Sequence, residues 1–262
     1  MKKSIFGLIG SALFLTSISM HSPANANEPE FRWATGLDYT SGEYSDDLTT
    51  EILYVPFTGT ALLGDFTFKA TVPYIRIKGP GTVVGGGEIG PITRNRVPAN
   101  ITTQGGLGDV TASMTYTAYM QNNTMFVDFT GKVKLPTASS AKNLGTGKAD
   151  FTTQIDMTKK TGDLNLFATA GYRFMGSSDT LPLQNGFLGS LGASVDVSNR
   201  ASIGLIYDYR QSASINSANP SELTGFVSWK LAKKLRLQAY GIVGFSNGSP
   251  DGGAGIQISF QP

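Results

Sequence analysis

LNLFATAGYRFM, residues 164–175, decides the fold class, because its side chains alternate between two faces. The apolar face holds Leu164, Leu166, Ala168, Ala170, Tyr172 and Phe174. The other face holds Asn165, Thr169, Gly171 and Arg173, with Phe167 and Met175 among them. A period of two is typical of a β-strand, and a strand of about 9–11 residues is long enough to cross a bilayer at a tilt. The stretch therefore predicts a membrane-spanning strand.

The same alternation recurs along the chain after residue 29. It predicts twelve strands at about residues 30–40, 49–57, 64–76, 107–119, 125–135, 149–159, 164–175, 186–197, 200–211, 221–231, 235–246 and 252–260. Pro56 and Pro73 fall inside or near strand ends, and proline cannot donate to a ladder. We therefore expect those ends to be frayed or bulged.

The connections between these strands alternate in length. The short ones are 121–124, 161–163, 198–199 and 232–234, and the long ones are 77–106, 136–148, 176–185, 212–220 and 247–251. Bacterial barrels have short periplasmic turns and longer outer loops. The sequence predicts an all-β fold, a transmembrane antiparallel β-barrel of about 12 strands with both termini in the periplasm.

The first 26 residues have the pattern of a secretory signal peptide. Lys2 and Lys3 precede an apolar run over 5–19, and Ala24-Asn25-Ala26 follows as an A-x-A cleavage site. The run is shorter than a membrane helix, which disfavours the alternative of an uncleaved anchor. We expect a signal peptide at 1–26, cleavage near Ala26, and a barrel at 27–262 in the outer membrane of a Gram-negative bacterium.

Composition excludes several classes of function. Removal of Lys2, Lys3 and His21 with the leader brings the 21 basic residues level with the 19 acidic ones and leaves no histidine. A basic surface for nucleic acid is therefore not expected. The chain has no cysteine, which excludes disulfides and thiolate metal sites. Without histidine, Ser-His catalysis and histidine metal ligation are also excluded, so we expect no enzyme, catalytic site, metal or cofactor.

Aromatic residues lie on the apolar face near both ends of the predicted strands. Those near the outer loops are Tyr172, Phe174, Phe187, Tyr207, Tyr209 and Phe245, and those near the turns are Trp33, Phe129, Trp229 and Phe260. Such girdles are typical of membrane barrels. The last strand resembles the C-terminal signal of outer-membrane barrels, which predicts contact with the barrel-assembly machinery. Membrane lipid and lipopolysaccharide are further expected partners; Arg94 and Arg96 are candidates for lipopolysaccharide phosphates, although solvation is the favoured interpretation.

The polar face carries charges of both signs, and charge facing lipid at mid-depth costs about 2–4 kcal/mol for Lys or Arg. We therefore place these side chains in the lumen, with Asp128, Lys132, Asp156, Arg173 and Asp208 within pairing range. One interpretation is a ladder of ion pairs that rigidifies a narrow barrel, and the other is a constriction that selects solutes. The candidate lumen residues are Asp128, Lys132, Lys134, Asp150, Asp156, Arg173, Asp208, Arg210 and Arg236.

Four short motifs carry a family resemblance. They are Gly106 to Asp109, Lys134-Leu135-Pro136-Thr137, Gly145-Thr146-Gly147 with Asp150, and Gly171-Tyr172. Together they resemble the outer-membrane family named for the meta-pathway of phenol degradation, with Ala138 in place of its usual glycine. The resemblance implies a monomeric barrel that takes up small, often aromatic or hydrophobic compounds. We interpret its motif residues as architectural, with Asp109 and Asp150 placed to bond loop amides.

The favoured function is passive uptake of a small solute through an outer-membrane channel. The first alternative is a structural or surface-interaction barrel that acts through its outer loops. The loop at 77–106 discriminates between them, because a constriction needs it to fold inward. The second alternative is a soluble periplasmic barrel whose apolar face surrounds a ligand, since alternation alone does not tell inside from outside.

Overall fold

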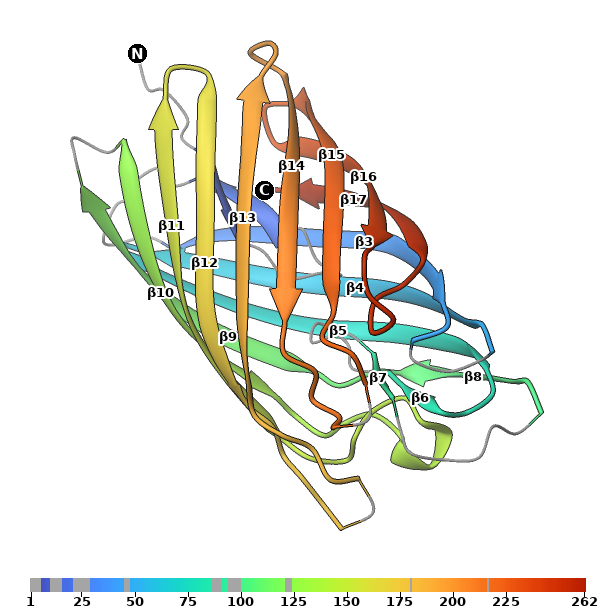
Figure 1. Cartoon of the computed structure of the whole chain (residues 1–262). Helices are drawn as coiled ribbons and strands as arrows, with labels where there is room; N and C mark the ends of the chain where they lie inside the picture. Colours follow the sequence, from blue (N-terminus) through green and yellow to red (C-terminus); the bar gives the residue numbers. More distant parts are fainter. Residues whose placement is uncertain are drawn as a thin grey trace.

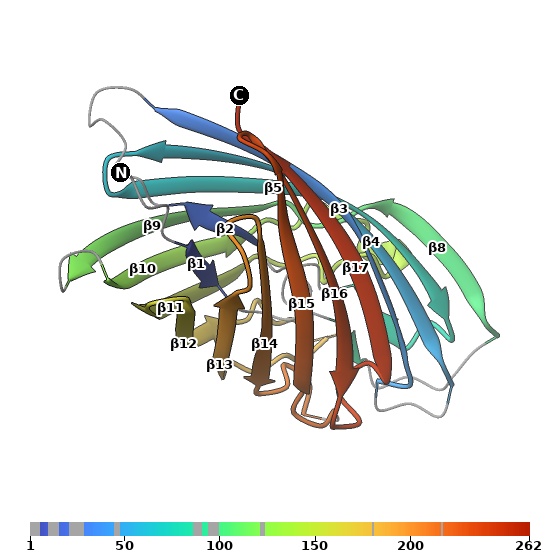
Figure 2. The same ribbon diagram turned by 90° about the horizontal axis from the view of Figure 1, so that it is seen from above.

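The chain folds into a closed antiparallel β-barrel (Figures 1 and 2). The computed structural model describes residues 6–9, 16–20, 29–44, 48–85, 91–93, 100–120, 124–179, 181–215 and 217–262. Each strand pairs with its neighbour in sequence, and β3 (Glu30–Gly42) pairs with β17 (Gly252–Phe260) to close the ring. β8 (Thr102–Leu107) and β9 (Thr111–Met120) both pair with β5 (Phe66–Gly79), so they form one interrupted strand. The barrel therefore has the twelve strand positions that the sequence predicts.

The remaining strands alternate in direction between the turn end and the loop end of the barrel. They are β4 (Thr50–Leu63), β10 (Met125–Lys134), β11 (Asp150–Thr161), β12 (Leu164–Phe174), β13 (Gly186–Asp196), β14 (Ala201–Arg210), β15 (Ser221–Ala232) and β16 (Leu235–Gly244). A two-stranded sheet of β6 (Val83–Val84) and β7 (Ile92–Thr93) lies in the loop after β5, and the 3-10 helix η2 (Ser140–Lys142) lies in the loop after β10.

Two strand boundaries differ from the prediction. β4 continues through Leu63, so residues 58–63 are strand rather than connection, and the turn is Gly64-Asp65. Gly64 has a φ of +57°, which suits a tight turn without a Cβ. The fourth strand begins at Thr102, because β8 pairs with the outer half of β5. The loop predicted at 77–106 is therefore 80–101.

The two strand prolines do not fray their own strands. Pro56 lies opposite Pro73 in the β4–β5 register. The neighbouring ladder is interrupted beside each of them instead: within the described β3–β4 ladder, Gly36 and Leu37 have no paired partner, and residues 108–110 separate β8 from β9. A proline has no N–H to donate, so the strand beside it has an unpaired stretch where that hydrogen bond would otherwise form. The Gly108 N–H donates to the Pro73 carbonyl at 2.8 Å across the second gap.

The apolar face points outward, as the membrane interpretation requires. Leu166, Leu191, Leu205 and Val243 are exposed on the outer surface, while the residues between them face the interior and are mostly buried. The predicted girdle residues are exposed too, except for half-buried Tyr172, whose ring meets those of Phe174 and Phe187 edge-on at 5.0 and 4.8 Å. In the soluble-barrel alternative the apolar face would point inward, so this orientation is the opposite one.

Parts of the predicted leader are also described. β1 (Phe6–Ile9) and β2 (Thr16–Met20) pair antiparallel, and β1 contacts β12 and β11. Ala24–Ala26, the predicted cleavage site, lies outside the described residues. In the described part of the chain, no helix has the length and hydropathy to span a membrane.

Candidate functional site

The lumen is lined by alternate residues of every strand. All nine predicted lumen residues lie on this inward face, and all except half-buried Lys132 and Arg236 are buried. The structure distributes them over the length of the barrel rather than into one ring. Lys134, Asp150, Arg173 and Arg210 lie at the outer ends of their strands, and Arg236 lies at the turn end of β16.

The motif residues form a buried ion cluster at the outer end. Lys134 Nζ lies 3.0 Å from Asp109 Oδ2 and 2.7 Å from Asp150 Oδ2, and it donates to Thr146 Oγ1 at 2.9 Å. All three ionised side chains are 2 % exposed or less. Gly145 passes close by, since a Cβ there would lie 2.6 Å from Asp109 Oδ2. The motifs thus meet at one lysine, which joins the end of β10 to the start of β11 and to the segment just before β9.

Each carboxylate of this cluster also holds a loop. The Ala138 N–H donates to Asp109 Oδ1 at 2.9 Å, and the Gly176 N–H donates to Asp150 Oδ1 at 2.8 Å. The Thr137 hydroxyl accepts from the Val110 N–H at 2.8 Å. Both aspartates thus make the bonds to loop amides that the sequence predicted, and each bond joins the start of an outer loop to the barrel wall.

The other lumen charges do not form the group of opposite charges that the sequence predicted, because two pairs of acidic residues face each other. Asp128 lies directly opposite Asp156 in the β10–β11 register, and Asp208 lies opposite Glu222. Arg210 pairs with Glu222 at 2.8 Å, a partner that the sequence did not single out.

Neutral groups satisfy two more of these charges. Asp156 accepts from Gln154 Nε2 at 2.8 Å and from the Thr169 hydroxyl at 2.6 Å. Arg173 donates to the Gln211 carbonyl at 2.7 Å, which ties it to the loop after β14.

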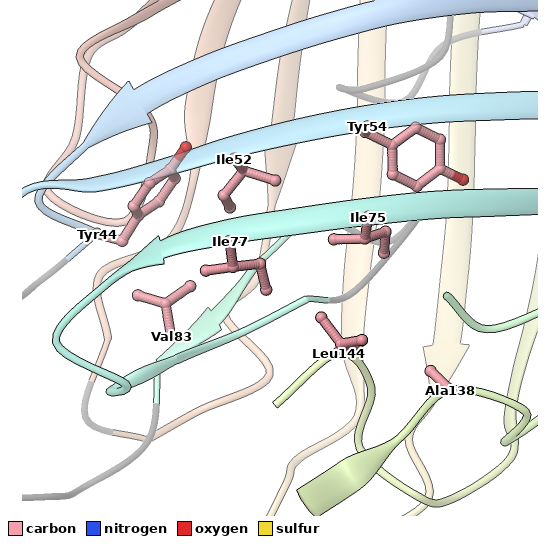
Figure 3. Close-up of a cluster of buried hydrophobic side chains, with 8 residues drawn as sticks. All are labelled: Tyr44, Ile52, Tyr54, Ile75, Ile77, Val83, Ala138 and Leu144. Carbon is pink, nitrogen blue, oxygen red and sulfur yellow. The ribbon is translucent and has the colours of Figure 1, made fainter. Parts of the chain in front are cut away.

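Outer loops fold inward onto the wall. Val83 and Leu144 from two loops pack against Ile75 and Ile77 of β5 and against Tyr44 and Tyr54 (Figure 3). Both loop side chains are 1 % exposed. Tyr44 has a left-handed φ of +51° and donates to the Thr40 hydroxyl at 2.8 Å. Burial raises the pKa of Tyr44 above its ordinary value, so the ring stays neutral.

Hydrogen bonds and a second apolar cluster join the loops to one another. The Gly85 N–H donates to the Asn143 carbonyl at 2.9 Å, and the Asn143 side chain donates to the Gly81 carbonyl at 3.1 Å. The second cluster brings three loops together through Val84, Ile92, Met175, Ala213 and Leu183. The described part of the 80–101 loop therefore packs inward, in two apolar clusters at the outer end.

An apolar patch interrupts the polar wall at mid-depth. Phe167, Ile206 and Phe226 are buried together on the inward face, with Tyr240 packed against them. Glycines on adjacent strands make room for the rings: a Cβ at Gly192 would lie 2.8 Å from the ring of Phe167. The sequence showed Phe167 among polar residues, but it gave no sign that the four side chains meet.

The turn end of the lumen holds a cavity of about 290 Å³. Its lining residues come from β11, β13, β14, β15, β16 and β17 and from the turns between them, and they include Arg236 of the predicted set. Among the described residues, no three acidic, histidine or cysteine side chains are grouped to hold a metal ion. Along the inward face the structure thus has apolar loop clusters at the outer end, a mixed polar and aromatic middle, and a cavity with several basic side chains at the turn end.

Comparison with known proteins gives a family and a fold. The sequence profile of the family described as "Putative MetA-pathway of phenol degradation" matches residues 28–261. No curated protein matches the chain. An outer membrane channel from Pseudomonas putida F1 superposes with a TM-score of 0.66 at 13% identity, over 92% of this chain and 100% of that one.

Two porins are similar at lower scores. The NanC porin gives a TM-score of 0.55 at 10% identity, over 88% of this chain and 100% of its own. The KdgM porin gives 0.52 at 9% identity, over 87% and 98%. At such identities the likeness establishes a shared barrel architecture.

Proposed function

Since this chain belongs to the phenol-degradation MetA-pathway family, we propose that it is a passive outer-membrane channel for small solutes with an aromatic or otherwise hydrophobic body. The closed barrel, its outward apolar face and its lumen supply the architecture. The names of the similar structures, an outer membrane channel and two porins, agree with this role.

The observation that carries the proposal is the inward fold of the outer loops. Val83, Val84 and Ile92 of the 80–101 loop are buried, at 4 % exposure or less, rather than projecting from the surface. A loop that recognised another cell surface would present its side chains outward. This placement favours transport over the surface-interaction alternative, and its apolar character suits solutes that shed water easily.

The lumen residues have different roles in this proposal. Lys134 and Asp150 hold the loops, and Arg210 is neutralised by Glu222. Asp128, Lys132, Asp156, Arg173 and Asp208 line the middle and outer path, and Arg236 lines the exit. We infer that the charges near the motifs are structural, while those along the path tune which ions and polar solutes pass.

Three further expectations belong to the same proposal. The leader at 1–26 is removed on export, so that the mature barrel begins at Asn27. β17 presents its alternating apolar side chains to the barrel-assembly machinery, and lipopolysaccharide surrounds the outer loops. Arg94 and Arg96, the candidates for lipopolysaccharide contact, lie outside the described residues. The channel works without catalysis or cofactor.

Single-channel recording tests the channel proposal. The protein is purified from outer membranes of a Gram-negative host and inserted into planar bilayers, beside a porin of known conductance. We expect discrete conductance steps, and swelling of loaded liposomes that is faster with small aromatic solutes than with sugars of equal mass. Electrically silent barrels whose liposomes exclude both solutes would overturn the proposal.

A further inference from the structure

One row of the barrel wall carries basic side chains on alternate strands. Paired positions of neighbouring strands connect Arg32 on β3 to Arg173 on β12 without a break. In the order β3, β4, β5, β9, β10, β11 and β12, the row consists of Arg32, Thr60, Lys69, Ser113, Lys132, Thr152 and Arg173. Every second member is a cation and every member between them has a hydroxyl group. This basic row therefore offers hydrogen-bond donors, and no carboxylate, along seven adjacent strands.

The basic row faces the lumen and climbs through the barrel. Phe31 and Trp33 flank Arg32 and are exposed on the outward face, which places Arg32 on the inward face. Arg32 lies near the turn end of β3, whereas Arg173 lies near the loop end of β12, because the hydrogen-bonded rows of a tilted barrel are staggered. Its cations are about 10 Å apart, since neighbouring strands are about 4.8 Å apart. A solute that crosses the barrel therefore passes them at successive depths.

The acidic side chains of the lumen are less accessible than the basic ones. Six inward acidic residues of the strands are buried at 6 % exposure or less, namely Asp38, Asp128, Asp150, Asp156, Asp208 and Glu222. Six inward basic residues of the described strands are only partly buried, namely Arg32, Lys69, Lys132, Lys160, Lys230 and Arg236. The accessible part of the basic row thus comprises its first three cations, while Arg173 is buried.

The accessible acidic residues are few and lie beside cations. In the described strands, the inward acidic residues that keep accessible surface are Glu30 and Asp196, both at the turn end. Glu30 lies 3.7 Å from Arg32, and Asp196 lies 2.9 Å from Lys160. A dissolved ion in the lumen therefore contacts mainly ammonium, guanidinium and hydroxyl groups. These groups replace water around an anion, whereas a cation finds few accessible carboxylates.

We propose that the basic row is the selectivity element of the channel and that it favours small anions, such as simple carboxylates, over cations. Arg32, Lys69 and Lys132 contact the passing anion in turn, and the hydroxyl groups of Thr60 and Ser113 donate to it between them. This inference rests on the proposed channel function and adds the charge of the preferred solute.

Reversal potentials of single channels in a potassium chloride gradient test the proposal. We expect chloride to be more permeant than potassium, and the same sign when acetate replaces chloride. The permeability ratio should be larger at 0.1 M than at 1 M salt, because the Debye length falls from about 10 Å to about 3 Å.

Variants assign the selectivity to the basic row. Lys69→Gln and Lys132→Gln are each expected to lower the chloride-to-potassium permeability ratio at least about twofold, since each removes a fixed charge that concentrates anions. Arg76→Gln is the matched control, because Arg76 lies on the same strand as Lys69 but is exposed on the outward face. It should leave the ratio unchanged. Heat-modifiable migration in gels verifies that each variant is a folded barrel.

The outcomes separate this inference from the channel proposal. Conductance steps that are cation-selective or unselective would overturn the inference and leave the channel standing. Equal effects of Lys69→Gln and Arg76→Gln would do the same, because the selectivity would then not come from the lumen wall. Electrically silent barrels would overturn both.

Discussion

Replacement of Lys134 by methionine should lower the free energy of unfolding of the barrel more than a substitution on its surface does. The substitution keeps an unbranched side chain one atom shorter but removes the cation from Asp109 and Asp150, which lie 3.0 and 2.7 Å from it. Both carboxylates are 2 % exposed or less, so water does not replace the lost partner. Breaking a buried ion pair from one side costs about 3–5 kcal/mol. Because Lys134 ends β10, Asp150 begins β11 and Asp109 lies just before β9, we expect that loss in the global free energy of unfolding.

Urea unfolding of the barrel in lipid vesicles measures this loss. The two tryptophans, Trp33 and Trp229, are on the outer surface, where their fluorescence changes when the barrel leaves the lipid. The midpoint should fall at an unchanged slope. Lys142→Met, which removes an exposed lysine from η2, is the matched control and should leave the midpoint in place.

A rescue variant separates charge from packing. Adding Asp109→Asn and Asp150→Asn to Lys134→Met removes the uncompensated charges while keeping side-chain oxygens for the loop amides. Stability should then recover to within about 1 kcal/mol of the unmodified barrel, because neutral replacement of a buried ion cluster is often harmless. If Lys134→Met alone shifted stability by less than about 1 kcal/mol, the cluster would not be holding β9, β10 and β11 together.

The remaining predictions concern the apolar contacts of the lumen. Gly204→Ala would place a Cβ 2.5 Å from the ring of Phe226, and overpacking of this kind should lower the free energy of unfolding by about 1–3 kcal/mol in the same urea assay. Gly131→Ala is the control, because nothing lies within 4 Å of a Cβ there, and it should leave stability unchanged. Equal effects of the two substitutions would contradict the packing argument. Leu144→Ala deletes a side chain that is 1 % exposed, at about 2–5 kcal/mol for buried leucine. We expect it to release the 135–149 loop, which would be seen as protease cleavage there and a larger unit conductance. A loop that stays resistant at unchanged conductance would show that Leu144 does not hold the loop against the wall.

The strand pattern was predictable because lipid imposes one rule on every outward residue. Alternation therefore identified the strands and the two faces of each, while strand length and the parity of the loops favoured the apolar face as the outer one. The predicted strand boundaries were wrong where the alternation of apolar and polar residues is weak. Residues 58–63 were assigned to a connection although β4 continues to Leu63, and β8 was assigned to a loop because Gly105 and Gly106 weaken its pattern.

The candidate site was predictable in its polarity but not in its partners. The inward position of Lys134 follows from alternation, whereas its bonds to Asp109 and Asp150 depend on loop geometry. Burial of Leu144 and Val83 was likewise beyond the sequence, since an apolar residue in an outer loop has no period to indicate where it packs.

Closure of the ring by β3 and β17 has a consequence for biogenesis. These strands are the first and last of the barrel, and the Gln261 side chain bonds Glu30 across 231 positions of sequence. The β3–β17 pair cannot form before the end of the chain has been synthesised, so the free edges of both strands stay unpaired until then. Contacts this remote in sequence form slowly, and open edges pair readily with foreign strands. We therefore expect the chain to be prone to aggregation before the ring closes, and removal of residues 252–262, which include β17, to leave an open sheet rather than a smaller pore.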